Sequence, residues 1–279
     1  MSSPALMTNT MVDRGRRRQY NGPARQLLLT TQLTPAEWDV QYSRQAGWTR
    51  PTRTYLYRQA NLAKARRVLD VGSGTGAVTE EVAARTAGQV IGIDIDPQVV
   101  DFARGRGGRA EYRLGDAHGL PFAGGLFDIT VCHFVLLWCQ DPRRVVSEML
   151  RVTRSGGAVL VCAEPDYGGR IDYPELPLGR WQIEALQREG ADPCLGRKLR
   201  SLFAPRAVDY LEVGVIPGLW DPGTLRGEFD AEWSLWERAL REQVPAEELA
   251  QVKATDRAAT DSGERLVFMP VFHALARHR

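Results

Sequence analysis

The sequence of 279 residues contains little cysteine, almost no lysine and no long apolar run. Its four cysteines form no CxxC pair, which argues against a disulfide scaffold or a cysteine-rich metal site. The longest apolar stretch, residues 129–139, is interrupted by His133 and is far shorter than the roughly 20 residues of a membrane-spanning helix. The first residues show no apolar segment before their charges. We therefore expect a cytoplasmic protein with reduced cysteines, no secretory signal and no membrane association.

Histidine is also scarce, and the four histidines show neither HxxxH nor HExxH spacing, so we expect no metal site. Charge is unevenly distributed. Residues 1–66 hold 11 Arg and Lys against 3 Asp and Glu, a net charge of +8, whereas the remainder carries −6. A basic arm on an acidic body is one way in which a protein can bind nucleic acid. Arginine is preferred throughout the chain, however, which favours a solvated terminus and makes nucleic acid an unlikely partner.

The bulk composition, 43% hydrophobic and 25% charged residues, is typical of a globular protein with a core. Within residues 66–163, short β-rich runs alternate with helical stretches. The strands are expected at 67–71, 89–95, 110–114, 127–134 and 157–163, and the helices at 78–86, 97–104 and 143–152. This alternation predicts an α/β fold with a Rossmann-like, doubly wound and mostly parallel sheet, whose ligands bind beyond the carboxyl ends of the strands.

The flanking regions predict additions to this core. Thr34, Pro35 and Glu37 form a helix-start signal, and we expect helices at about 34–45 and 51–62 with Gly47 between them. After the core we expect a helix at 178–188, a strand at 208–216, helices at 225–243 and 245–259, and an antiparallel closing strand at 265–275, where Pro270 suggests an edge or a bulge. The expected organisation is a flexible basic arm (1–30), an N-terminal helical lid (31–65), a cofactor-binding core (66–163), an insertion or cap (164–207) and the remaining strands and helices (208–279).

The most informative segment is Val68-Leu69-Asp70-Val71-Gly72-Ser73-Gly74-Thr75-Gly76, a strand that opens through three glycines into a helix. Glycine is required where a backbone turns tightly or lies against a ligand, and the helix offers free N–H groups. A dinucleotide site would read GxGxxG, but the spacing here is GxGxG with Asp70 two residues before it. That acid would repel a pyrophosphate and attract an ammonium group.

This segment resembles the first motif of class I S-adenosylmethionine-dependent methyltransferases. Further segments resemble the family in the same order: Asp94 at the end of the second strand, Gly115-Asp116-Ala117 after the third, residues 127–136 in the fourth-strand region and residues 150–157 before the fifth strand. The resemblance implies that Asp94 accepts hydrogen bonds from the ribose hydroxyls and that the Asp116 segment holds the adenine amino group. It assigns these residues to the cofactor: Asp70, Gly72, Ser73, Gly74, Gly76, Asp94, Ile95, Asp116, Ala117, His133 and Phe134. Tyr42 and Arg53 of the lid are candidates for its carboxylate.

The implied reaction is in-line transfer of a methyl group from S-adenosylmethionine to a small molecule, with S-adenosylhomocysteine as product. His133 could act as a base, and Asp166 or Tyr167 could contact the substrate; the alternatives are pocket lining and loop capping. Four tryptophans of the C-terminal half either pack in a core or form an aromatic wall, namely Trp181, Trp220, Trp233 and Trp236. The competing functions are methylation of RNA, protein or peptide through the basic arm, and a non-catalytic cofactor-binding relative. The sequence leaves the acceptor atom and the oligomeric state open.

Overall fold

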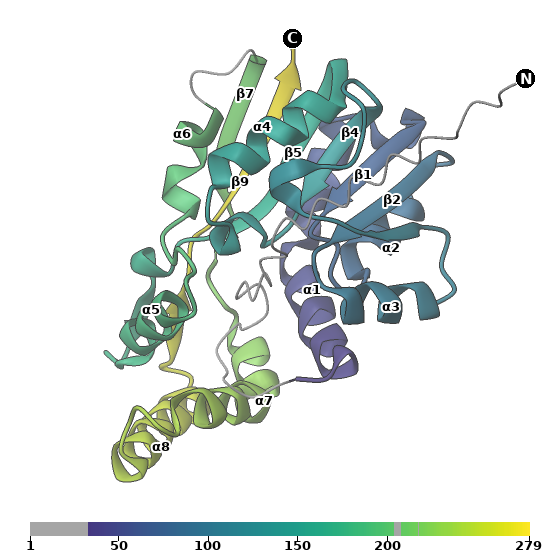
Figure 1. The fold of residues 1–279 in the computed structure, drawn as a ribbon. Helices are drawn as coiled ribbons and strands as arrows, with labels where there is room; N and C mark the ends of the chain where they lie inside the picture. Colours follow the sequence, from purple (N-terminus) through teal and green to yellow (C-terminus); the bar gives the residue numbers. More distant parts are fainter. Residues whose placement is uncertain (1–32, 204–207, 217) are drawn as a thin grey trace, which may run out of the picture.

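A computed structural model describes residues 33–203, 208–216 and 218–279, so the basic arm expected at 1–30 lies outside the described residues. At its centre is a seven-stranded sheet in the order β3-β2-β1-β4-β5-β9-β7 (Figure 1). The strands are β1 (Arg67–Val71), β2 (Gln89–Asp94), β3 (Glu111–Leu114), β4 (Phe127–Cys132), β5 (Thr153–Pro165), β7 (Val208–Ile216) and β9 (Val271–His278). The first five strands pair in parallel, whereas β9 is antiparallel to both of its neighbours, β5 and β7. The predicted Rossmann-like fold is confirmed, and strand order reverses between β1 and β4.

Helices connect these strands and extend beyond them. The helices are α1 (Pro35–Gln59), α2 (Ala77–Ala83), α3 (Pro97–Gly105), α4 (Pro142–Val152), α5 (Leu178–Arg188), α6 (Leu199–Phe203), α7 (Pro222–Leu240) and α8 (Ala246–Ser262). The 3₁₀ turns are η1 (Leu62–Lys64), η2 (Ala117–Gly119), η3 (Leu136–Trp138), η4 (Tyr167–Gly169) and η5 (Gly196–Lys198). A small second sheet pairs β6 (Ile171–Tyr173) with β8 (Leu266–Phe268) in antiparallel fashion.

Strand β1 shows how the parallel sheet is buried on both faces. Val68 packs with residues of α1 and α2, while its neighbour Leu69 belongs to the cluster that includes residues of α4 and α6. Both side chains are completely buried. Successive side chains of a strand point to opposite faces, so the unbroken apolar run serves two cores. Each such residue contributes about 1.5–3 kcal/mol through burial.

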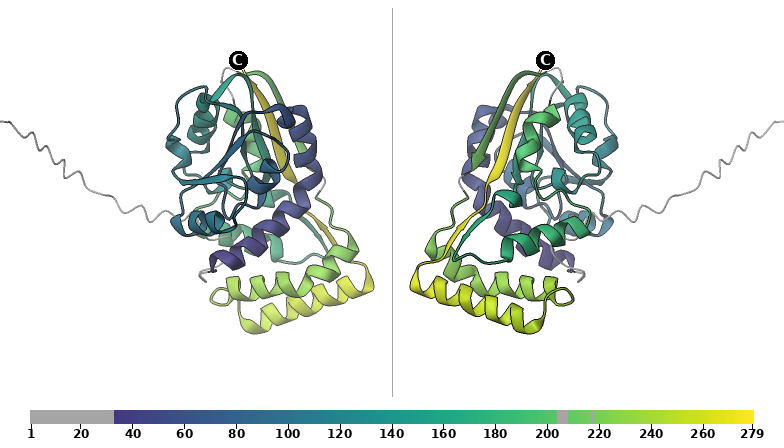
Figure 2. Two further views of the ribbon diagram at one scale, coloured as in Figure 1. Left: turned by 90° about the vertical axis from the view of Figure 1, so that its right-hand side faces the viewer. Right: turned by 90° about the vertical axis from the view of Figure 1, so that its left-hand side faces the viewer.

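The additions to the core gather at one end of the sheet. Helices α5, α7 and α8, with the N-terminal half of α1, lie beyond the carboxyl ends of the parallel strands (Figures 1 and 2). Helices α7 and α8 pack side by side, and the indole N–H of Trp233 donates to Asp256 across them at 2.6 Å. This end of the sheet is therefore covered by helices that come from both ends of the described chain.

Two expectations about element boundaries were wrong. Helix α1 is continuous from Pro35 to Gln59, although Gly47 and Pro51 lie inside it. Its predicted start is confirmed, because Thr34 and Glu37 form a capping box. The expected closing strand is divided at Pro270 into β8 and β9, and β9 lies between β5 and β7 instead of at the edge. Proline removes the ladder N–H, so the strand is interrupted there.

Candidate active site

The turn between β1 and α2 depends on three glycines. Gly72, Gly74 and Gly76 have positive φ angles of 72°, 51° and 95°. Residues with a Cβ rarely adopt this region of conformational space. A Cβ at Gly72 would also overlap Val135, and one at Gly74 would come within 2.9 Å of the Tyr42 ring. The motif therefore forms a tight turn whose backbone lies directly against neighbouring side chains.

Asp94, at the end of β2, holds this turn in place. Its Oδ2 accepts a hydrogen bond of 2.8 Å from the N–H of Gly74. The N–H groups of Gly72 and Ser73 both donate to the carbonyl of Ile93, at 2.8 and 2.9 Å. The Ser73 hydroxyl is buried, and its oxygen has no hydrogen-bond partner in the described structure. Buried polar atoms are normally satisfied, so this hydroxyl is a natural contact for a bound ligand.

Asp70 is the buried acid of the motif, with only 1% of its surface exposed. The hydroxyl of Thr79 donates to its Oδ2 at 2.7 Å. The pKa of Asp70 is raised to about 7, mainly by burial and also by the nearby charge of Asp94, while Thr79 and Arg53 act in the opposite direction. A cationic ligand group beside Asp70 would stabilise its charged form and lower this pKa.

The loop after β4 is held by Glu164, a completely buried residue of β5. Its carboxylate accepts N–H hydrogen bonds from Val135, Leu136 and Leu137, at 2.9, 2.8 and 3.2 Å. Burial raises the pKa of Glu164 to about 7, against the effect of these three bonds. Phe134 adopts a positive φ of 57°, uncommon for a bulky residue. Glu164 therefore fixes the backbone that carries the end of β4 over the glycine turn.

His133 begins this loop and contacts helix α1. Its Nε2 lies 2.7 Å from the Thr49 hydroxyl and 3.4 Å from Nη1 of Arg53. Burial, together with the Arg53 charge, holds the pKa of His133 well below its usual value. A guanidinium can only donate, so this geometry makes Nε2 an acceptor and places the proton of the neutral ring on Nδ1. This arrangement favours a neutral His133 that forms hydrogen bonds, and it disfavours a general base that removes a proton from the substrate.

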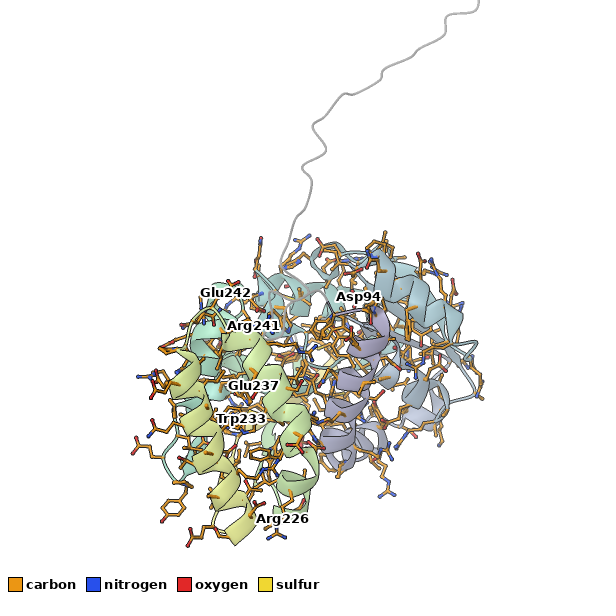
Figure 3. All side chains as sticks on the ribbon, turned by 90° about the horizontal axis from the view of Figure 1, so that it is seen from below. Asp94, Arg226, Trp233, Glu237, Arg241 and Glu242 are labelled. Carbon is orange, nitrogen blue, oxygen red and sulfur yellow. The ribbon has the colours of Figure 1, made fainter. Side chains whose placement is uncertain are left out.

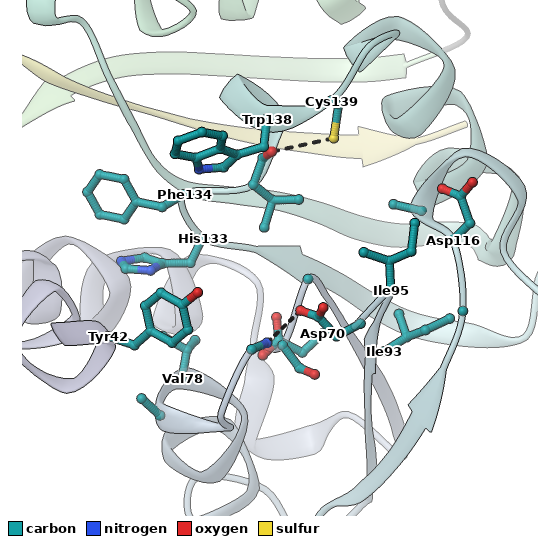
Figure 4. Close-up of a pocket in the computed structure, with 18 of the residues that line it drawn as sticks. Tyr42, Asp70, Val78, Ile93, Ile95, Asp116, His133, Phe134, Trp138 and Cys139 are labelled. Atoms are coloured by element: carbon teal, nitrogen blue, oxygen red, sulfur yellow. Dashed lines mark hydrogen bonds between the residues drawn. The ribbon is translucent and has the colours of Figure 1, made fainter. Parts of the chain in front are cut away.

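These elements enclose a cavity, which we term the sheet cavity, at the carboxyl ends of β1, β2, β3 and β4. Figure 4 shows Tyr42, His133 and Phe134 at one side, Asp116 and Ile95 at the other, and Asp70 between them. Asp116 accepts from the N–H of His118 at 2.8 Å and so begins the 3₁₀ turn η2. Trp38 stacks on Tyr42 with ring centres 5.3 Å apart. Helix α1 therefore forms one wall of the cavity.

Most residues assigned to the cofactor from sequence meet in this cavity. They are Tyr42, Asp70, Gly72, Ser73, Gly74, Asp94, Ile95, Asp116, Ala117, His133 and Phe134. Gly76 does not line the cavity; it closes the turn and precedes α2, and a Cβ there would overlap the Tyr112 hydroxyl. Its requirement for glycine is therefore conformational.

Arg53 and Asp166 do not line the sheet cavity. Arg53 is completely buried, because its guanidinium is enclosed between Thr49, His133 and an ion pair with Glu81. This placement differs from the expected carboxylate contact. Asp166 is also buried, and its Oδ2 accepts from Arg197 at 2.5 Å.

Tyr167 lines a different space. A second cavity, which we term the cap cavity, lies between α1, α5, α7 and α8 and includes Tyr167 in its wall. Trp220, Trp233 and Trp236 also line it, whereas Trp181 does not. Core packing was the preferred expectation for these residues, and Trp181, Trp233 and Trp236 are indeed buried in one cluster of the cap. Trp233 and Trp236 also border the cap cavity.

Sequence reasoning missed several residues of the sheet cavity. Trp38 and Gln45 lie on the same face of α1 as Tyr42, and Trp138 and Cys139 follow the loop after β4. The spacing of residues 38, 42 and 45 is a helical i, i+4, i+7 pattern, which was available in the sequence. Glu164 was missed as the residue that holds the loop, because no local pattern indicates which N–H groups a buried carboxylate will accept.

Residues 69–161 match the family described as a methyltransferase domain. Residues 69–161 therefore form a methyltransferase domain. The chain is 32% identical over 168 residues to an uncharacterised methyltransferase of Schizosaccharomyces pombe, covering 55% of this chain and 60% of that protein. It is 34% identical over 166 residues to a demethylmenaquinone methyltransferase of Paenarthrobacter aurescens, covering 59% and 61%. The chain thus spans about three fifths of the length of these two relatives.

The methyltransferase fold is also seen in solved structures. A phosphoethanolamine N-methyltransferase of Haemonchus contortus, solved with S-adenosylhomocysteine, superposes with a TM-score of 0.55 at 15% identity. The match covers 82% of this chain and 53% of that one. In the part of the chain that the structure describes, no group of three or more His, Cys, Asp or Glu could hold a metal ion. No helix among the described residues has the length and apolar character needed to cross a membrane.

Proposed function

We propose that this methyltransferase domain binds S-adenosylmethionine in the sheet cavity and that the protein methylates a small molecule. The observation that carries the proposal is the convergence of three carboxylates, Asp70, Asp94 and Asp116, beside a side-chain-free glycine turn in one cavity. These acids come from the ends of β1 and β2 and from the loop after β3. A dinucleotide pyrophosphate would face the carboxyl groups of these three acids there.

The donor and acceptor groups of the cavity fit the parts of the cofactor. Asp70 would attract its ammonium group, and Asp94 would accept from the two ribose hydroxyls. The Asp116 segment would hold the adenine amino group, with Ile95 and Ala117 beside the ring. The unpartnered Ser73 hydroxyl and the N–H groups of the glycine turn are available to further polar atoms. Tyr42 is our candidate for the cofactor carboxylate; Arg53 is too deeply enclosed to reach it without rearrangement.

When bound, S-adenosylmethionine supplies a methyl group that its sulfonium has already activated. The protein's contribution is then to align the acceptor and to exclude water. Helix α1 and the loop after β4 form two walls that can do this. We assign His133 to positioning through its Nδ1 hydrogen, Tyr167 to contact with the acceptor, and Asp166 to holding the loop of Tyr167 through Arg197.

Two further facts support a small acceptor. The named relative from Paenarthrobacter aurescens acts on demethylmenaquinone, a small molecule. The cap cavity adjoins the sheet cavity and is enclosed by helices, which suits a molecule that can be surrounded. Methylation of RNA or a peptide would need an open, complementary surface at the mouth of the site.

Calorimetry on the purified chain tests cofactor binding. We expect heat on titration with S-adenosylmethionine and S-adenosylhomocysteine and none with NAD. Binding of NAD alone would contradict the proposal. Transfer is measured separately, from cofactor labelled in its methyl group to a metabolite extract and to total RNA. Label in the metabolite fraction supports a small acceptor, and label in RNA alone overturns it. Cofactor binding without any transfer would favour the non-catalytic alternative.

A further inference from the structure

The cap cavity has a chemical character that the methyltransferase domain does not dictate. Helix α7 lies between α8 and α1 at the covered end of the molecule (Figure 3), and its inward side carries Phe229, Trp233 and Trp236. Trp48 of α1 and Trp220 complete an aromatic wall, with their ring centres 4.7 Å apart. Aromatic faces of this number favour a flat, largely apolar ligand.

The cap cavity borders the sheet cavity. Trp38 and Gln45 of α1 line both spaces. Only these two side chains therefore stand between a molecule in the cap cavity and a ligand beside His133 and Phe134. Methyl transfer needs direct contact between the acceptor atom and the methyl group, so an acceptor in the cap cavity has to reach past Trp38 and Gln45.

The two arginines that line the cap cavity, Arg170 and Arg265, are both paired with carboxylates. Arg170 donates to both oxygens of Asp172, at 2.8 and 3.0 Å, and Arg265 forms ion pairs with Asp172 and Asp256. Two guanidinium groups thus meet two carboxylates. Neither arginine is left unpaired to receive an anionic ligand.

Two acids of the cavity share one cationic partner. Glu228 and Glu232 of α7 both line the cavity, and among the described residues a single cation, Arg44 of α1, pairs with both of them. The guanidinium of Arg44 also lies over the Trp48 ring, 5.3 Å from its centre. Arg44 itself does not line the cavity. Two carboxylates against one guanidinium leave one negative charge near the aromatic side chains that line the cavity, and both features attract a cation.

A buried donor supports a ligand in this space. The indole N–H of Trp48 is buried and has no hydrogen-bond partner in the described structure, whereas that of Trp233 donates to Asp256. An unsatisfied buried donor is costly, and an acceptor atom on a ligand would remove that cost.

We infer that the cap cavity binds the methyl acceptor and that this acceptor is a flat, largely apolar molecule carrying a cationic nitrogen, held by Glu228, Glu232 and the tryptophan faces. That the ligand is the methyl acceptor rests on the proposed function. The charge and aromatic character of the cavity are independent of it.

A matched set of three probes tests the charge preference with the full chain. Naphthalen-1-ylmethylamine, 1-naphthalenemethanol and 1-naphthoic acid share one ring system and differ in charge. We expect the amine to bind at least tenfold more tightly than the alcohol, and the acid to bind most weakly, by calorimetry with and without saturating S-adenosylhomocysteine. Equal affinities, or a preference for the acid, would overturn the inference.

Variants locate the binding. Glu232→Gln and Glu228→Gln should each reduce the preference for the amine by several fold, whereas Glu247→Gln, an exposed acid at the start of α8, should leave it unchanged. Trp220→Ala should weaken all three probes. If the Glu→Gln variants and the control show the same preference for the amine, the acids of the cap cavity do not recognise the charge of the ligand. Titration of the same samples with S-adenosylhomocysteine separates the two proposals: cofactor binding without amine preference rejects this inference alone, and amine preference without cofactor binding rejects the proposed function.

Discussion

The carboxylate of Asp94 combines two tasks in one residue. It accepts from the N–H of Gly74, and so shapes the glycine turn, and it faces the cavity in which we place the ribose. We predict that Asp94→Ala weakens binding of S-adenosylhomocysteine by about 1.5–3 kcal/mol, the scale of hydrogen bonds to a charged group. Calorimetry gives the dissociation constant, and Asp101→Ala, an exposed acid on α3, is the matched control. An unchanged constant for Asp94→Ala would show that the ribose is held elsewhere.

Asp70 makes the free energy of unfolding depend on pH. Its pKa is about 7 in the folded protein and near 3.8 when unfolded, so the folded state binds its proton more tightly. The contribution of Asp70 to stability is complete below about pH 4 and is lost as pH rises through 7. We predict that the unliganded protein loses free energy of unfolding over this range, as measured by urea denaturation. Asp70→Asn should flatten the dependence, with the remaining slope assigned to Glu164, whose pKa is also about 7.

The same carboxyl should release a proton when a cationic ligand binds. An ammonium group near Asp70 favours the carboxylate, so binding at pH 6 displaces the proton and binding at pH 8.5 does not. Calorimetry in buffers with different ionisation enthalpies counts the released protons. Proton release that persists in Asp70→Asn would assign the effect to another group.

At the scale of an element, the loop after β4 depends on a single buried acid of β5. Glu164→Gln keeps the shape of the side chain but replaces one oxygen by a donor that must face backbone N–H groups. We predict a loss of about 1–3 kcal/mol in the free energy of unfolding, the cost of leaving buried donors unsatisfied. Cofactor affinity should fall as well, since Val135 packs against Gly72. Thermal and urea unfolding measure the first effect, and Glu184→Gln on the exposed side of α5 is the control. Equal stability of the two variants would contradict the role of Glu164.

Elements of the core could be predicted from sequence because their signals are local. The run Val68 to Gly76 specifies both a strand and its turn, and the fold class followed from the alternation around it. Helix α1 was divided wrongly because Gly47 and Pro51 are helix breakers by propensity. The helix continues through them because tertiary contacts bury Trp38, Leu56 and Tyr57 against the core, and packing overrides propensity. Burial of Arg53 could not be anticipated either, since its partners Glu81 and His133 are distant in sequence.

At the scale of the whole molecule, charge and enclosure are the features on which we base the proposed small acceptor. Acids and aromatic rings are prominent in the lining of the cap cavity. Residues 1–30, outside the described part, hold five arginines and one acid, which is half of the +8 charge of residues 1–66. We predict that deletion of residues 1–30 leaves cofactor binding intact and changes methyl transfer only modestly. Labelled transfer by full-length and truncated protein, to a metabolite extract and to total RNA, checks this. Strong labelling of RNA that disappears on truncation would contradict a small acceptor.

Because Trp38 and Gln45 belong to both cavities, we expect the two proposed ligands to influence each other's affinity. The ligand that binds first loses binding free energy to the conformational entropy of ordering these side chains. The second ligand then meets side chains that are already ordered. Linkage makes the effect reciprocal: the factor by which the cofactor changes acceptor affinity must equal the factor by which the acceptor changes cofactor affinity. Helix α1, which precedes the sheet in sequence, would thus couple binding in the sheet cavity to binding in the cap cavity. Substitution of Gln45 should change the factor by which each ligand alters the affinity for the other, without removing either site.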